Sequence, residues 1–221
     1  MGRELDGVMF DKDGTLLDFH QTWDRAVGAT LRELAPDATA LAGAAGAVGY
    51  DLAGERVERD SPIVAESNAT IMARLDDWLD TSEFESRLMA NAVSTTRPAT
   101  GARHLLETLV AAEVAVGLVT NDSEVVAREQ LAQLGWERYF AAVVGYDSGF
   151  GAKPEPGPVL AGAECMGVDP GAAAMIGDSL HDVAAARDAG VLAVYLGTVT
   201  DIGALADLVV SNLVELASLL E

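Results

Sequence analysis

Two aspartates, Asp11 and Asp13, stand two residues apart directly after a short apolar run, residues 5–10. If that run is a strand, both carboxylates point to the same side, because the side chains of a strand alternate between its faces. One carboxylate can then attack a substrate while the other moves protons. Gly14 follows, and an Asp-Gly pair is also a common turn signal. The pair alone therefore leaves open a catalytic site and an ordinary turn.

Three later loops carry polar side chains of complementary chemistry. They hold, in chain order, Thr120 with Asn121, Lys153 before a proline, and Asp178 with Asp182. Each loop follows an apolar run that predicts a strand, at residues 114–119, 141–144 and 172–176. The loops after the strands of an open parallel sheet lie at its carboxyl edge, where ligands bind. The convergence of these groups predicts a metal-assisted phosphate site.

The predicted site has a specific physical logic. Carboxylates such as Asp11 and Asp178 suit Mg²⁺, a hard cation that also shares phosphate oxygens with its substrate. The ammonium of Lys153 and the hydroxyl of Thr120 would stabilise phosphate oxygens in the transition state. Mg²⁺ is therefore the expected cofactor.

Hydrophobic patterning divides the chain into two parts. Helical patterns at residues 102–112, 124–134, 156–166 and 180–189 alternate with the strands above, and further strands are expected at 191–196 and 208–210. This alternation predicts a doubly wound parallel sheet with helices on both faces. Helical spacing alone is seen at residues 21–34, 63–79 and 83–93, and no strand is expected between 18 and 97. Residues 1–17 and 98–221 are therefore predicted to form a Rossmann-like α/β core, and residues 18–97 an inserted all-helical cap domain.

Composition limits the partners and the setting. A formal net charge of −21 disfavours nucleic acid and anionic membranes, which bind clustered Lys and Arg. No apolar run approaches the roughly 18 residues of a transmembrane helix. The single cysteine, Cys165, is expected to be a buried structural thiol. Together with a polar N-terminus, these features predict a cytoplasmic protein. The sequence leaves a monomer and a homodimer open as alternatives.

The four polar groups, in this order along the chain, resemble the four motifs of the haloacid dehalogenase superfamily. The matching residues are Asp11-Lys12-Asp13-Gly14-Thr15, Thr120-Asn121, Lys153-Pro154 and Gly177-Asp178 with Asp182. The helical insertion resembles the cap of the phosphoglycolate phosphatase-like branch. The resemblance implies Mg²⁺ dependence and an aspartyl-phosphate intermediate on Asp11.

The resemblance also implies individual roles. Asp13 would protonate the leaving oxygen, then activate water, and would give its backbone carbonyl to the metal. Asp178 would be a metal ligand, and Asp182 would support the metal site from nearby. Thr120, Asn121 and Lys153 would bind phosphate.

Asp13 also separates the branches of the family. Dehalogenases generally lack an aspartate there, so halide displacement is disfavoured. Phosphonate hydrolases rely on a cap lysine, whereas residues 18–97 contain none. A phosphomutase of the β-phosphoglucomutase type shares the core motifs and stays an alternative, as does a non-catalytic phosphate-binding protein.

The expected substrate is a small phosphorylated metabolite resembling phosphoglycolate. Arg56 and Arg59 could pair with a substrate carboxylate, because a guanidinium binds carboxylates in bidentate fashion. The alternative is that they pair with neighbouring acids at the surface. The linkers near residues 17–18 and 97–98 are expected to act as hinges for closure of the helical domain. His20, near the first of them, is a further candidate for substrate contact.

Overall fold

The protein is described here by a computed structural model that covers residues 5–58, 61–66, 68–198 and 203–220. The chain divides into two compact units. One consists of Met1–Asp18 with Pro98–Glu221, and the other of Phe19–Arg97. The two segments that connect them are tied together within the larger unit, where Leu17 pairs with Pro98 and the N–H of Ala99 donates to the carbonyl of Leu16.

The larger unit is built on a six-stranded sheet in the order β5-β4-β1-β6-β7-β8, in which all neighbouring strands run parallel. Its strands are β1 Gly7–Phe10, β4 Ala115–Val119, β5 Ala142–Val144, β6 Ala173–Gly177, β7 Leu192–Leu196 and β8 Leu208–Val210. The chain proceeds outward from β1 to β4 and β5, then returns to β6 on the other side of β1. The topological switch point therefore lies between β1 and β6, and ligands of such sheets bind at the carboxyl ends there.

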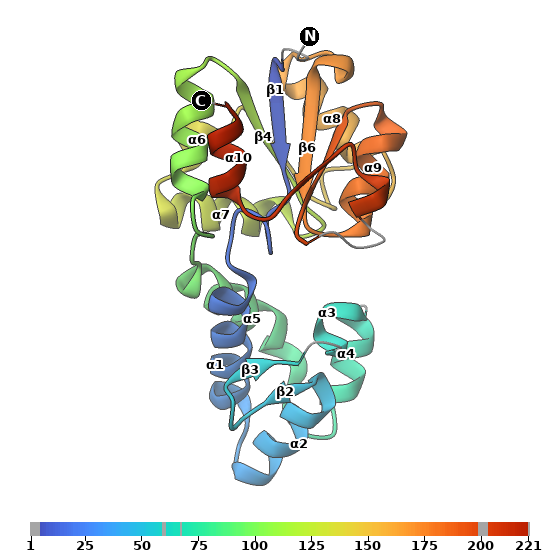
Figure 1. Cartoon of the computed structure of the whole chain (residues 1–221). Coiled ribbons are helices and arrows are strands. Elements are labelled where there is room, and N and C mark those ends of the chain that lie inside the picture. The colour runs from blue at the N-terminus through green and yellow to red at the C-terminus, as the bar shows by residue number, and fades with distance from the viewer. Residues whose placement is uncertain (1–4, 59–60, 67, 199–202, 221) are drawn as a thin grey trace. The chain divides into compact units, whose positions relative to one another are not determined.

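Helices cover both faces of this sheet (Figure 1). The helices are α6 Ala102–Ala111, α7 Glu124–Leu134, α8 Gly157–Met166, α9 Leu180–Ala189 and α10 Leu213–Leu220, with 3₁₀ turns at Glu137–Tyr139, Pro170–Ala172 and Gly203–Leu205. Val8 and Phe10 of β1 join the apolar cluster with α6, α7 and α10, whereas Met9 joins the cluster with α8 and α9. Because side chains alternate along a strand, β1 contributes to the apolar clusters on both faces of the sheet. The predicted α/β fold class is confirmed.

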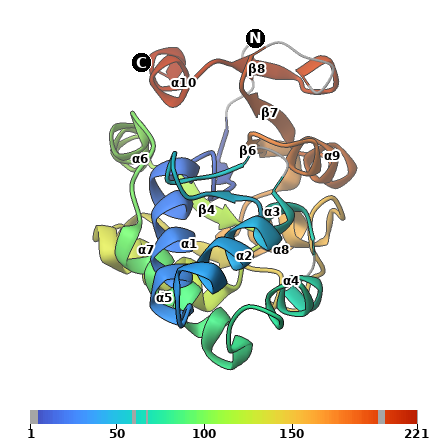
Figure 2. The ribbon, with the colours of Figure 1, turned by 90° about the horizontal axis from the view of Figure 1, so that it is seen from below.

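The second unit is mainly helical. It comprises the π-helix His20–Asp24, α1 Arg25–Leu34, α2 Ala38–Val48, β2 Tyr50–Asp51, β3 Arg56–Val57, α3 Pro62–Ala65, α4 Asn68–Leu75, the 3₁₀ turn Thr81–Glu83 and α5 Phe84–Thr95. Helices α1 and α5 run side by side (Figure 1, Figure 2). A separate apolar cluster fills this unit, so it has a core of its own.

Three local expectations differ from the structure. Strands β2 and β3 form a short antiparallel pair between residues 50 and 57, where no strand was expected, because two-residue strands give no apolar alternation to detect. The helical pattern at 63–79 is divided into α3 and α4, which end at Ala65 and Leu75. Cys165 is exposed rather than buried, since the apolar face of α8 passes through its neighbours Ala161 and Ala163. Across the described residues, no helix combines the length and apolarity that a bilayer crossing needs.

Candidate active site

A tight loop after β1 carries the first two aspartates. The Asp11 N–H continues the sheet by donating to the Ile176 carbonyl, 2.8 Å away. The loop then folds on itself, because the Leu17 N–H donates to the Lys12 carbonyl and the Gly14 N–H to the Leu17 carbonyl. Gly14 has φ +85°, and a Cβ there would lie 2.3 Å from Asp178 Oδ2. Only glycine therefore allows this loop to approach the loop after β6.

Lys153 joins the loops into one charged centre. Its Nζ lies 2.5 Å from Asp11 Oδ1, 2.6 Å from Asp182 Oδ1 and 2.8 Å from the Val119 carbonyl oxygen. The residue is 4% exposed. Burial opposes the charged ammonium, but the carboxylates of Asp11 and Asp182 outweigh it and raise the pKa of Lys153. Lys153 is thus a protonated, buried cation in direct contact with the predicted nucleophile.

Three aspartates gather beside this cation. Carboxylate oxygens of Asp11, Asp178 and Asp182 lie within 4.8 Å of one another. Burial raises the pKa of Asp11 to about 7, with a smaller lowering by Lys153 and further raising by Asp182 and Asp178. Burial, followed by the nearby Asp182, raises the pKa of Asp178 to about 6. The cluster therefore holds more negative charge than Lys153 neutralises, which is the condition that a divalent cation would relieve.

The position of Asp182 is set by the start of α9. Its Oδ2 accepts hydrogen bonds from the N–H and the hydroxyl of Ser179, and Ser179 Oγ in turn accepts from the Asp182 N–H. This capping box fixes the first turn of the helix. Gly177 is required beside it, because a Cβ on Gly177 would lie 2.2 Å from Asp182 Cγ.

The loop after β4 positions Lys153 rather than only lining the site. The Asn121 amide donates to the Lys153 carbonyl through Nδ2 and accepts from the Lys153 N–H through Oδ1, both at 2.8 Å. Thr120 is buried, and its Oγ1 accepts from the Asp122 N–H at 3.0 Å. The predicted phosphate ligands are therefore brought together, with the Asn121 side chain engaged by the Lys153 backbone.

A second buried cation lies beside Asp13 and was not among the predicted site residues. Lys12 Nζ lies 2.6 Å from Asp13 Oδ2, 3.0 Å from Asp122 Oδ2 and 2.5 Å from Gln130 Oε1. Asp13 and Asp11 thus face different lysines. Only the placement of Lys12 between two acids within the first motif could have signalled this.

Two of the three predicted substrate residues of the second unit, His20 and Arg56, lie among the described residues and have different partners. His20 is 70% exposed and its Nδ1 lies 3.3 Å from Asp24 Oδ2. Arg56 lies in β3, where its Nε is 3.6 Å from Asp51 Oδ2. Arg59 lies outside the described residues. The predicted roles of all three in substrate binding stay predictions.

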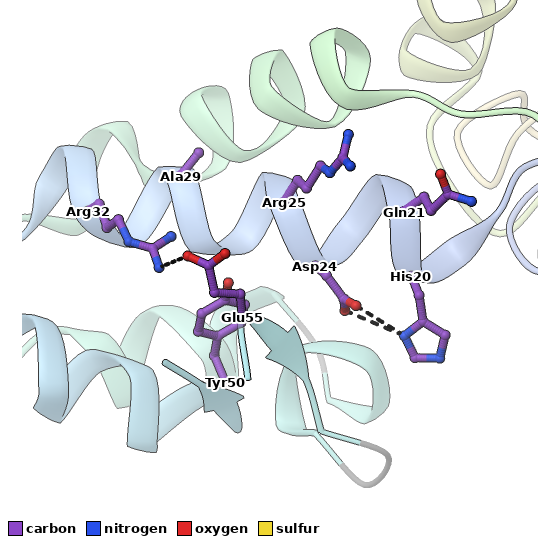
Figure 3. A pocket seen from close by; sticks show the side chains of 8 residues that line it. All are labelled: His20, Gln21, Asp24, Arg25, Ala29, Arg32, Tyr50 and Glu55. Carbon is purple, nitrogen blue, oxygen red and sulfur yellow. Dashed lines mark hydrogen bonds and ion pairs between the residues drawn. The ribbon is translucent and has the colours of Figure 1, made fainter. Parts of the chain in front are cut away.

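His20 also lines an open pocket of about 510 Å³ within this unit. The lining residues are His20, Gln21, Asp24, Arg25, Ala29, Arg32, Tyr50 and Glu55. Figure 3 shows His20 directed toward Asp24, and Arg32 toward Glu55, whose Oε1 is 2.8 Å from Arg32 Nη2. Most charged groups of the pocket are therefore paired with one another.

Comparison with known proteins agrees with this geometry. Residues 5–190 match the family of haloacid dehalogenase-like hydrolases. The chain belongs to this family. It is 33% identical over 190 residues to a phosphoglycolate phosphatase of Xylella fastidiosa, covering 83% of this chain and 76% of that protein.

Two further relatives of this hydrolase are informative. An N-acetylmuramic acid 6-phosphate phosphatase of Pseudomonas aeruginosa is 30% identical over 194 residues, which cover 84% of this chain and 79% of that protein. The crystal structure of a HAD phosphatase from Thermococcus onnurineus superposes with a TM-score of 0.71 at 27% identity, covering 98% of both chains. The predicted superfamily and the prediction of a phosphatase enzyme are confirmed.

Proposed function

We propose that this hydrolase is a Mg²⁺-dependent phosphatase acting on a small phosphorylated carboxylic acid, with phosphoglycolate as the first candidate. The observation that carries the proposal is the Asp11 carboxylate, held at 2.5 Å by the buried Lys153 beside an acidic cluster at the carboxyl edge of the sheet. The names of both phosphatase relatives denote phosphate monoesters of acids, which supports this substrate class. The unit Phe19–Arg97 is proposed to act as the cap that selects the substrate.

The metal would be held by the carboxylates of Asp11 and Asp178 and by the backbone carbonyl of Asp13, with Asp182 supporting the site. Bound there, Mg²⁺ supplies positive charge that reduces the repulsion between the phosphate and the attacking carboxylate. The donor set is all oxygen, as this cation prefers. The raised pKa values of Asp11 and Asp178 indicate that their negative charge is not fully compensated, and a bound cation would compensate it.

In the first proposed step, an Asp11 carboxylate oxygen bonds to phosphorus while the bond from phosphorus to the ester oxygen breaks. The carboxyl of Asp13 gives its proton to that departing oxygen. Lys153 lies against Asp11 and offers positive charge to the phosphoryl oxygens. Asn121 holds the Lys153 backbone in place through two hydrogen bonds.

In the second proposed step, the Asp13 carboxylate takes a proton from water as the water oxygen bonds to phosphorus. The bond between phosphorus and the Asp11 oxygen then breaks, which releases inorganic phosphate and restores Asp11. The net reaction consumes one water molecule.

The test is release of phosphate from p-nitrophenyl phosphate and from phosphoglycolate, with Mg²⁺ or with a chelator. We expect activity to require Mg²⁺ and to fall on the order of 10³-fold or more in Asp11→Asn, because that variant lacks the nucleophile. Asp6→Asn, which removes one exposed charge in the same unit, serves as the matched control. Full activity in chelator, or in Asp11→Asn, would contradict the mechanism. Isomerisation of a sugar phosphate in place of hydrolysis would instead establish the phosphomutase alternative.

A further inference from the structure

The chain contains only two lysines, Lys12 and Lys153, beside twelve arginines. Both lysines are buried and both contact an aspartate of the first motif. A buried ammonium is costly unless it is paired and hydrogen-bonded, so its retention calls for a specific partner. For Lys153 that partner is Asp11. Lys12 requires a separate explanation.

The surroundings of Lys12 come from three different segments of the larger unit. Asp13 is its neighbour in the loop after β1, Asp122 lies in the loop after β4, and Gln130 lies on α7. Lys12 Nζ thus donates a hydrogen bond to Gln130 Oε1 and forms ion pairs with the carboxylates of Asp13 and Asp122. Lys12 is 1% exposed and Gln130 is fully buried. Burial opposes the charged form, but Asp13 and Asp122 outweigh it and raise the pKa of Lys12.

These contacts restrain the Asp13 carboxyl directly. The Lys12 ammonium holds Asp13 Oδ2 at 2.6 Å, and the ammonium is itself held by Asp122 and Gln130. Asp122 in turn is fixed by its N–H to Thr120 Oγ1 and by the Ser123 N–H to its own Oδ1. The Lys12 ammonium is held by residues of the loop after β4 and of α7, so its contact with Asp13 limits the rotation of the Asp13 carboxyl group.

We propose that Lys12 is a positioning residue for Asp13, orienting its carboxyl for proton transfer to the departing ester oxygen. This inference rests on the proposed function, because it presupposes that Asp13 protonates the leaving group. Lys12 itself touches no reacting atom in this scheme. Its contribution is the fixed direction of the Asp13 carboxyl, which Asp122 and Gln130 maintain.

The test compares kcat/KM for p-nitrophenyl phosphate and phenyl phosphate, two substrates of similar shape. The value of kcat/KM reports the formation of the phosphoenzyme, and p-nitrophenolate departs readily without a proton whereas phenolate does not. We expect Lys12→Met to lose on the order of 10²-fold more activity with phenyl phosphate than with p-nitrophenyl phosphate, approaching Asp13→Asn. Tyr139→Phe removes a buried hydroxyl that bonds Glu107, away from this network, and should leave the ratio unchanged.

Lys12→Met removes the cation that contacts both Asp13 and Asp122. Lys12→Met combined with Asp122→Asn is therefore the second variant, in which one cation and one anion are removed together. The same selective loss is expected there. Equal losses with both substrates in either folded variant would overturn the positioning role. An unchanged ratio in Asp13→Asn would instead refute the proposed acid role of Asp13, so the two failures are distinguishable.

Discussion

We predict that ionised Asp178, a proposed metal ligand, lowers the free energy of unfolding when no metal is bound. Asp178 is mostly buried, and its pKa is raised from 3.8 to about 6 by burial and by Asp182. One pKa unit corresponds to about 1.4 kcal/mol, so ionised Asp178 costs up to about 3 kcal/mol of folding free energy. Asp178→Asn removes the charge and keeps an oxygen that accepts from Thr15 Oγ1. The metal-free variant should therefore be more stable than the natural chain at neutral pH.

The sign of the pH dependence follows from the raised pKa. The folded state binds this proton more tightly than the unfolded chain, so the cost is absent below about pH 4 and grows as pH rises to about 6. The free energy of unfolding of Asp178→Asn should equal that of the natural protein at pH 4 and exceed it by about 1–3 kcal/mol at pH 7.5. In thermal unfolding this corresponds to a gain on the order of 5 °C.

The assay is unfolding followed by circular dichroism, in chelator, at several pH values from 4 to 8. Asp6→Asn is the control, because it removes an equal charge from an exposed position. Added Mg²⁺ should stabilise the natural protein and have much less effect on Asp178→Asn, since a cation that binds only the folded state stabilises it by mass action. A variant no more stable than the natural chain at pH 7.5, or a gain that is the same at pH 4, would refute the reasoning.

Two further predictions concern the same site. Gly177→Ala should destabilise the larger unit by about 1–3 kcal/mol and lower activity, because the new Cβ would lie 2.2 Å from Asp182 Cγ. The measurement is unfolding in urea. The control is Gly46→Ala, at a helical glycine where an added Cβ would meet open space, and it should be neutral or stabilising. Mg²⁺ affinity measured by calorimetry should increase as pH rises from 5 to about 7, because Asp11, with a pKa of about 7, must lose its proton to bind the cation. An affinity independent of pH over that range would show that Asp11 is not a ligand.

The sequence by itself determined the fold class and which polar residues follow the strands at the carboxyl edge of the sheet. Short continuous apolar runs such as residues 173–176, alternating with helical patterns, are typical of parallel strands covered on both faces, and each run named above is followed by a polar loop. Because loops after parallel strands share one edge, Asp11, Lys153 and Asp178 could be assigned to one place before any coordinates were known. The sequence also predicted the bounds of α9 at residues 180–189, and the structure adds the capping box that Ser179 and Asp182 form at its start.

Only the tertiary structure decided which acid meets which cation. The alternation of a strand placed Asp11 and Asp13 on one side, but the tight loop after β1 gives them different partners, Lys153 and Lys12. Gln130 looked like an ordinary residue of an amphipathic helix, and its role depends on α7 packing against the sheet. Such contacts join segments more than a hundred residues apart, and no periodicity or spacing encodes them. The chemistry could be read from residue types, whereas the pairing of charges required the fold.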